Sequence, residues 1–271
     1  RLFIIQHDCG HAAFFKSKRA NHIVGAICST MVCTPYRAWN RDHAKHHASS
    51  GNLDERGIGD IWTLTVDEYL ALPPFKRLRY RLYRHPLILF GFGPAFLFLI
   101  LHRFTGGSPT TREFRSVHLT NLAILLVLLI ASFTIGLKAF LMVQLPILFI
   151  TCSTGVWMFY VQHQFEGVSW ARKEEWDYLA QALDGSSYYK LPKLLQWFTG
   201  NIGFHHIHHL SSRIPNYLLE KCHSENSLFR NVPEINWQQS LKSMQLHLWD
   251  EENRELVGFG FLKQYAPAKT G

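Results

Sequence analysis

Two long uncharged segments dominate the pattern of apolar and polar positions along the chain. Residues 119–136 and 139–161 contain no Asp, Glu, Lys or Arg. At a helical rise of about 1.5 Å per residue they extend about 27 Å and about 34 Å, which matches a bilayer core about 30 Å thick. The pattern therefore predicts two transmembrane helices.

Two further apolar segments are too short or too interrupted to predict full crossings. Residues 86–104 are interrupted by Gly91, Gly93 and Pro94, and we expect a re-entrant or interfacial segment there. Residues 22–33 favour an interfacial helix. The segments at 37–83 and 162–271 are polar and are expected outside the membrane.

These elements together predict an all-α integral membrane protein that forms a single domain over residues 1–271. Its transmembrane helices would carry a cytoplasmic helical cap. The chain starts with an apolar run at Arg1, which indicates a start inside a helix. Its five cysteines show no paired spacing, so neither a disulfide framework nor a thiolate zinc site is expected.

The net charge of +8 reflects topology rather than a nucleic-acid partner, because the basic residues form no stripe with interleaved aromatic side chains. If residues 86–104 return to the side they leave, Lys138 is the one basic residue in the opposite-side connection, and 27 of the 28 Lys and Arg face the other way. The positive-inside rule makes that side the cytoplasm. We therefore expect a multi-pass protein of the cell membrane with Asp54, Glu225 and Gly271 on the cytoplasmic side.

Histidines cluster in three windows of five residues: 7–11 (HDCGH), 43–47 (HAKHH) and 205–209 (HHIHH). These 15 positions hold 9 of the 16 histidines. On a helix, residues three or four apart lie on one face, so each window presents its imidazoles to one side. Imidazole is a common ligand for Fe, Zn, Cu and Ni. The windows therefore predict a metal centre.

The number of imidazoles predicts two metal ions. One tetrahedral or octahedral ion cannot use eight motif histidines, whereas two ions with about four imidazoles each would use them all. All three windows must then meet on one membrane face, which requires an even number of crossings between His47 and His205.

His163 is a ninth candidate ligand, because it follows the second predicted span on the face where the windows meet. His206 falls outside the HxxHH register and is expected beside the ligands. The other histidines, which we expect to be ordinary interfacial or surface residues, are His22, His85, His102, His118, His223 and His247.

Ligating imidazoles usually need a hydrogen-bond acceptor on the second ring nitrogen. The polar residues near enough in sequence to act as acceptors are Asp8, Asp42, Asp60, Glu166, Asp184 and Asn201.

At these residues the sequence resembles the membrane fatty acid desaturase family, in particular the bacterial acyl-lipid desaturases of the Bacillus type. The similar segments are residues 7–19, 43–62, 155–166 and 200–217. Family members carry a helical hairpin before the first histidine window, and here we expect most of that hairpin to be missing.

The resemblance implies an O2-dependent desaturase with a diiron centre, which introduces a double bond into an acyl chain of membrane lipids. It also implies a small electron carrier such as ferredoxin or a flavodoxin-like protein, and it supports His163 as a ligand. No catalytic residue is expected beyond the metal ligands, which are His7, His11, His43, His46, His47, His163, His205, His208 and His209.

Three alternatives remain at this stage. A diiron membrane hydroxylase acting on a lipid or hydrocarbon would use the same imidazoles. A metal carrier or sensor would need ligands along a transmembrane path, but the two predicted spans contain no His, Asp or Glu. A catalytic zinc needs three protein ligands, so eight or nine imidazoles are too many for a zinc hydrolase.

Overall fold

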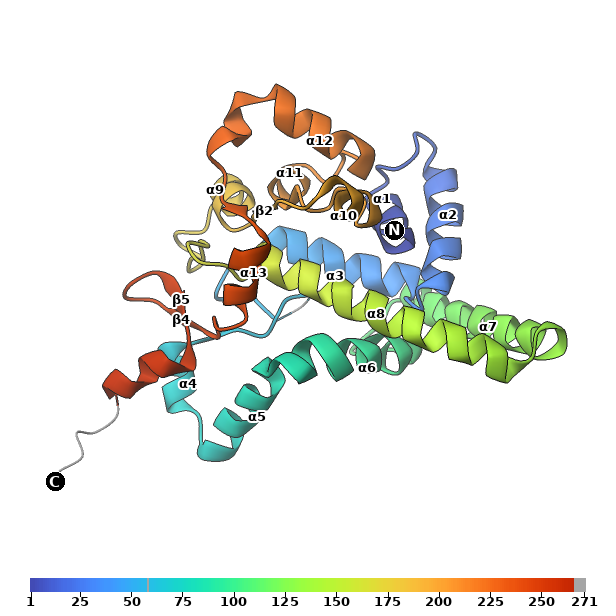
Figure 1. Cartoon of the computed structure of the whole chain (residues 1–271), viewed down its shortest axis with the longest axis horizontal. Coiled ribbons are helices and arrows are strands. Elements are labelled where there is room, and N and C mark those ends of the chain that lie inside the picture. Colours follow the sequence, from blue (N-terminus) through green and yellow to red (C-terminus); the bar gives the residue numbers. More distant parts are fainter. Residues whose placement is uncertain (58, 266–271) are drawn as a thin grey trace.

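The computed structural model describes residues 1–57 and 59–265 (Figure 1). Gly271, expected on the cytoplasmic side, lies outside this part. Most of the described residues are helical, as the apolar pattern predicts. The helices are α1 Leu2–Gly10, α2 Lys18–Met31, α3 Tyr36–Ser49, α4 Val66–Ala71, α5 Pro74–Arg84, the π-helical η1 Leu87–Phe92, α6 Gly93–Leu99, the 3₁₀ turn η2 Leu101–Arg103, α7 Thr111–Thr134, α8 Leu137–His163, α9 Tyr178–Asp184, α10 Lys193–Phe198, α11 His205–Leu210, α12 Asn216–Glu225, η3 Ser227–Asn231, α13 Trp237–Ser243 and η4 Phe259–Tyr265.

The all-α prediction is wrong at two small sheets. One has the order β1-β4-β5, with a parallel β1–β4 pair and an antiparallel β4–β5 pair, and the other is the parallel pair β2–β3. These strands have only two or three residues, too few for a period-two pattern to register in the sequence. Their bounds are β1 Leu64–Thr65, β2 Tyr188–Tyr189, β3 Glu234–Ile235, β4 Leu248–Asp250 and β5 Glu255–Val257.

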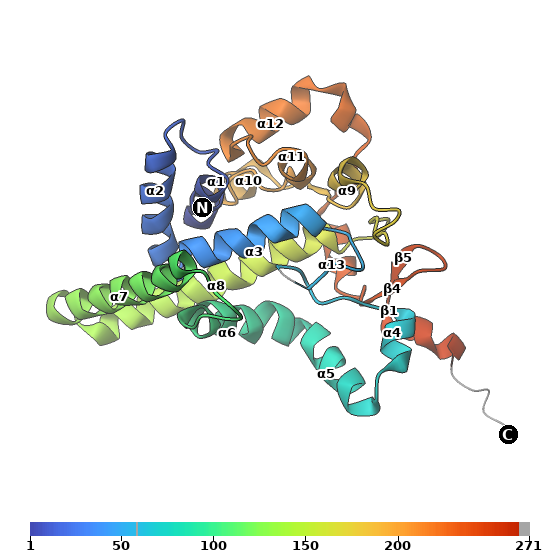
Figure 2. The same ribbon diagram turned by 180° about the vertical axis from the view of Figure 1, so that it is seen from behind.

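Helices α7 and α8 form an antiparallel arm that projects from the rest of the molecule (Figures 1 and 2). Both are long and apolar enough to cross a membrane. Helix α7 begins earlier than predicted, because Thr110 and Glu113 form a capping box before the apolar run. Gly136, with a φ of 85°, makes the turn between the two helices.

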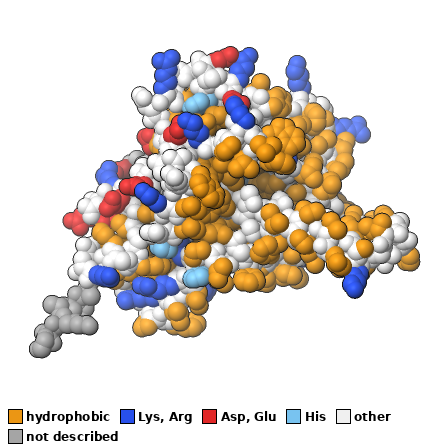
Figure 3. Space-filling model, viewed as in Figure 1, with side chains coloured by type: hydrophobic (Ala, Val, Ile, Leu, Met, Phe, Trp, Pro, Cys, Tyr) orange, Lys and Arg blue, Asp and Glu red, His pale blue; other side chains and the backbone are white. Residues whose placement is uncertain are grey.

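Apolar side chains cover the visible face of this arm (Figure 3). Phe133 on α7 and Met142 on α8 are 86% and 67% exposed. A water-facing surface rarely carries apolar side chains over such an area, whereas a lipid-facing one does. The helical run Leu87–Arg103 follows α5 with a bend of 59°, as a re-entrant segment or a broken span would.

Helix α3 lies alongside α8 in both views, with α9, α11 and α12 on its other side (Figures 1 and 2). The base of α8 is held by Arg84 at the end of α5, which is fully buried. Its guanidinium donates to the carbonyl of Leu246 at 2.7 Å, to Gln164 Oε1 at 3.0 Å and to the Tyr160 hydroxyl at 3.2 Å. Arg84 thus joins α5, α8 and the segment before β4 directly behind His163.

Candidate metal centre

Four helices bring the predicted ligands to one place. The window at 43–47 lies within α3, and the window at 205–209 forms most of α11. The first window runs over the end of α1: His11 follows the last helical residue but keeps a right-handed helical backbone, so it stays on the same side as His7. His163 is the last residue of α8.

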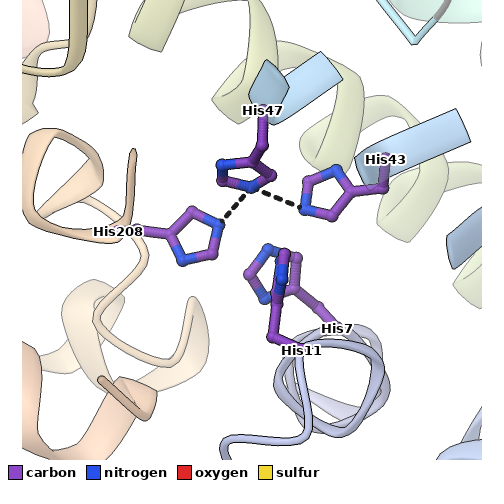
Figure 4. A group of neighbouring side chains, drawn as sticks. All are labelled: His7, His11, His43, His47 and His208. Carbon is purple, nitrogen blue, oxygen red and sulfur yellow. Dashed lines mark hydrogen bonds between the residues drawn. The ribbon is translucent and has the colours of Figure 1, made fainter. Parts of the chain in front are cut away.

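Five imidazoles form a first group, and Figure 4 shows their rings pointing toward one another. The Nε2 atom of His47 lies 2.9 Å from that of His208 and 3.1 Å from that of His43. All five offer a ring nitrogen within 4.8 Å of the others. The members of this group are His7, His11, His43, His47 and His208.

The other four imidazoles form a second group, in which the Nε2 atoms make a closed ring. His163 and His205 are 2.9 Å apart, His205 and His209 are 3.1 Å apart, and His46 lies 3.2 Å from His163 and 3.3 Å from His209. His47 of the first group stacks on His209 of the second, with centroids 4.4 Å apart. The groups are therefore adjacent, and together they contain all nine predicted histidines.

The spacing of the nitrogens fits metal coordination. With a metal–nitrogen distance of about 2.1 Å, neighbouring ligand nitrogens on one tetrahedral or octahedral ion lie about 3.0–3.4 Å apart. The Nε2 separations in the second group run from 2.9 to 3.3 Å. An ion can thus be reached by all four nitrogens with little movement of the rings.

The hydrogen bonds of His46 and His163 also favour a metal ion in the second group. His46 donates its Nδ1 proton to Asp60 over 2.6 Å, and His163 donates its Nδ1 proton to the carbonyl of Gly185 over 3.2 Å. A neutral imidazole has one N–H, so when both rings are neutral their Nε2 atoms are unprotonated. They face each other at 3.2 Å. In that form the two lone pairs are directed at one point, as ligation of one metal ion by both rings requires.

Burial keeps five of the clustered imidazoles neutral, which is the form that binds a metal. Desolvation, together with the neighbouring imidazoles, holds the pKa of each of the following histidines well below its ordinary value of 6.5: His43, His47, His205, His208 and His209.

Two of the six proposed acceptors contact ligand candidates. Asp8 accepts from His7 Nδ1 at 2.9 Å and from the backbone N–H of Asn216 at 2.6 Å, which ties α1 to α12. Asp60 accepts from His46 as described above. The other four make no hydrogen bond to the nine imidazoles in the described part of the chain: Asp42, Glu166, Asp184 and Asn201.

Two contacts were not expected from the sequence. The acceptor for His163 is the backbone carbonyl of Gly185, and no side-chain pattern marks a backbone carbonyl. His223, predicted to be isolated, lies 3.3 Å from His206, with His206 Nε2 facing His223 Nδ1. His206 belongs to neither group, as the HxxHH register predicts.

Aromatic side chains wall both groups. The indole of Trp39 stacks on His43 with centroids 4.4 Å apart, and the ring of Phe159 lies 4.9 Å from His46 and 5.2 Å from His163. These rings remove water from the sides of the imidazoles, so polar contacts inside are stronger than in water.

Comparisons with known proteins agree with this geometry. A sequence model described as fatty acid desaturase matches residues 1–239. The chain is 49% identical over 263 residues to a fatty acid desaturase of Bacillus subtilis, an alignment that covers 97% of this chain and 75% of that protein. It is 28% identical over 286 residues to the sn-1 oleoyl-lipid 12-desaturase of Synechocystis, with 97% and 76% covered. It is also similar to the sn-1 acyl-lipid omega-3 desaturase (ferredoxin) of Synechocystis, with 29% identity over 265 residues and 89% and 69% covered.

Proposed function

Because this chain belongs to the fatty acid desaturase family, we propose that it introduces a double bond into an acyl chain of a membrane lipid, with O2 and two histidine-bound irons. The overall reaction balances as –CH2–CH2– plus O2, two electrons and two protons giving –CH=CH– and two waters. The observation that carries the proposal is the pair of adjacent imidazole groups, with the Nε2 atoms of His46 and His163 facing each other at 3.2 Å.

The ligand assignment follows the two groups. One iron would be held among His7, His11, His43, His47 and His208, and the other among His46, His163, His205 and His209. When bound, the iron pair would supply the redox chemistry with O2 that removal of hydrogen from an unactivated methylene requires, because no amino-acid side chain supplies it.

The chain's own residues orient the ligands and keep the site dry. Asp60 and the Gly185 carbonyl fix the Nδ1–H tautomers of His46 and His163, which leaves Nε2 free on each ring. Asp8 does the same for His7. Trp39 and Phe159 shield the ligands from water on two sides.

We also propose the setting of the reaction. Helices α7 and α8 would cross the membrane and return the chain to the side it left, which puts the metal centre on the cytoplasmic side. The acyl substrate would be part of a membrane lipid. The names of the two Synechocystis relatives give an oleoyl-lipid and an acyl-lipid as the substrates of those proteins. The electrons would come from a small carrier of the ferredoxin or flavodoxin type, and one of those relatives is named as ferredoxin-dependent.

The test is expression of the complete gene in a host that lacks unsaturated lipids and has a working electron supply. We expect new double bonds in the acyl chains by mass spectrometry, and about two irons per chain in the purified protein. Unchanged acyl chains would count against desaturation, and hydroxylated chains in their place would assign the hydroxylase alternative. A single zinc with no iron in an active preparation would exclude the dinuclear centre.

A further inference from the structure

A groove of about 590 Å³ lies between α2 and the start of α7, away from the two histidine groups. The first two residues of α3, Tyr36 and Arg37, also line it. Its lining divides into two kinds of side chain. Three arginines lie at the polar part, Arg37, Arg112 and Arg115, whereas Ile27, Leu119 and Ala123 contribute an apolar part.

The three arginines have no acidic partner among the described residues. Arg37, Arg112 and Arg115 are exposed and take part in no ion pair of this part of the chain. The nearby carboxylate of Glu113 is buried and already paired with Arg41 at 2.9 Å. The polar part of the groove therefore carries an uncompensated positive charge.

The apolar part follows along the axis of α7. Leu119 is one turn beyond Arg115 and Ala123 is one turn further, so the groove changes from cationic to apolar over about 12 Å. Leu119 and Ile27 are 64% and 58% exposed. Because α7 is a candidate span that begins at Thr111, its arginines fall at the level where a bilayer changes from head groups to acyl chains.

We propose that this groove binds one phospholipid, with its phosphate between the three arginines and an acyl chain along Ile27, Leu119 and Ala123. Guanidinium groups bind phosphate oxygens through two parallel N–H donors. The three arginines therefore fit the phosphate of a lipid head group. A free phosphate would leave the apolar part uncovered. The site differs from the metal centre, and its existence does not depend on the desaturation proposed above.

A photo-cross-linker tests the assignment. Benzoylphenylalanine would replace Ile27 in the protein expressed from its complete gene, in membranes that contain phosphatidylglycerol. After irradiation and purification, we expect an adduct with the mass of a phospholipid. An adduct to a second copy, to another protein or to another segment of this chain would overturn the proposal, because polypeptide would then fill the groove.

Two variants separate a bound lipid from bulk lipid. Arg112→Gln with Arg115→Gln removes two phosphate donors, and Ala123→Trp fills the apolar part while keeping the arginines. Loss of charge-assisted hydrogen bonds predicts a fall in lipid adduct of about tenfold for the first variant, and Ala123→Trp should also lower the yield. The matched control, Arg213→Gln with Arg230→Gln, removes two exposed charges elsewhere and should leave the yield unchanged. An adduct yield that neither groove variant lowers would show that Ile27 faces only bulk lipid.

Discussion

The carboxylate of Asp60 lies 2.6 Å from Nδ1 of His46, and it comes from the loop that follows α3 rather than from the helix that carries the histidine. This contact decides which nitrogen of His46 carries the proton. It also orients the ring so that Nε2 points toward His163 and His209. A residue outside every histidine window thus determines how a motif histidine presents its lone pair.

Asp60→Asn should weaken metal binding. The amide keeps the size of the side chain but loses the charge that holds the His46 tautomer, and loss of such a partner typically costs about 10- to 100-fold in metal affinity. Competition with a chelator measures this on purified protein. Asp67→Asn, an exposed change on α4, is the control and should have no effect. Equal iron retention in the two variants would contradict a positioning role for Asp60.

His163→Ala should lower iron content and reduce desaturation to near background at equal expression. The second group would keep three of its four imidazoles, and no other side chain can take the place of His163. Gln162 donates to the carbonyl of Ile202, and Gln164 is engaged with Arg84. Elemental analysis and product analysis give the two readouts.

The controls for that variant are His102→Ala and His247→Ala, since neither residue belongs to the two groups. Both should retain iron and activity. If His163→Ala also retained them, the ligand set would reduce to the three histidine windows.

Local spacing explains which parts of the centre could be predicted. The HxxHH windows fall on helices α3 and α11, where the three- and four-residue offsets place the rings on one face. The position of His163 beside the windows was predictable because it directly follows a long apolar segment. The Gly185 carbonyl and the choice of Asp60 over Asp42 depend on how distant loops fold back, which no local period encodes. The same holds for the parallel pairing of β1 with β4, where Leu64 is matched with Leu248.

Acidification should destabilise the metal-free protein. His43, His47, His205, His208 and His209 have a pKa well below 6.5 when folded, because burial disfavours their charged form. The unfolded chain therefore takes up more protons as pH falls. The stability that these neutral rings contribute is fully present above about pH 6.5. Below that pH each such ring lowers the free energy of unfolding by up to about 1.4 kcal/mol per pH unit.

Thermal denaturation in detergent at pH 7.5 and pH 5.5 measures this dependence. The midpoint of thermal unfolding of the metal-free protein should be lower at pH 5.5 than at pH 7.5. Bound iron should raise the midpoint at both pH values, because a bound metal stabilises the folded state. A midpoint that does not change with pH in the metal-free protein would contradict the burial of these neutral rings.

Arg84→Lys should destabilise the fold behind the metal centre. An ammonium cannot reach the acceptors on Leu246, Gln164 and Tyr160 together, so buried acceptors lose their donors, at about 1–3 kcal/mol each. A loss of about 3 kcal/mol corresponds to a fall of about 6–12 °C in the melting midpoint for a protein of this size. Arg79→Lys, an exposed change on the same helix, should shift it by little. Equal midpoints for the two variants would show that Arg84 does not hold the base of α8.

Single cysteines in a cysteine-free background should reveal the topology. The histidine groups contain residues from both sides of the α7–α8 arm, such as His46 and His205, so the arm must return the chain to the face it leaves. The proposed topology puts 27 of the 28 Lys and Arg on that face, and the positive-inside rule would then make it cytoplasmic. An impermeant thiol reagent added to intact cells should modify a cysteine at Lys138 and leave cysteines at Asp54 and Glu225 unmodified until the membrane is opened. Modification of a cysteine at Asp54 or Glu225 from outside, with none at Lys138, would reverse the orientation. If the cysteines at Asp54 and Glu225 were modified from opposite faces, the number of crossings between them would be odd, which the shared cluster of imidazoles forbids.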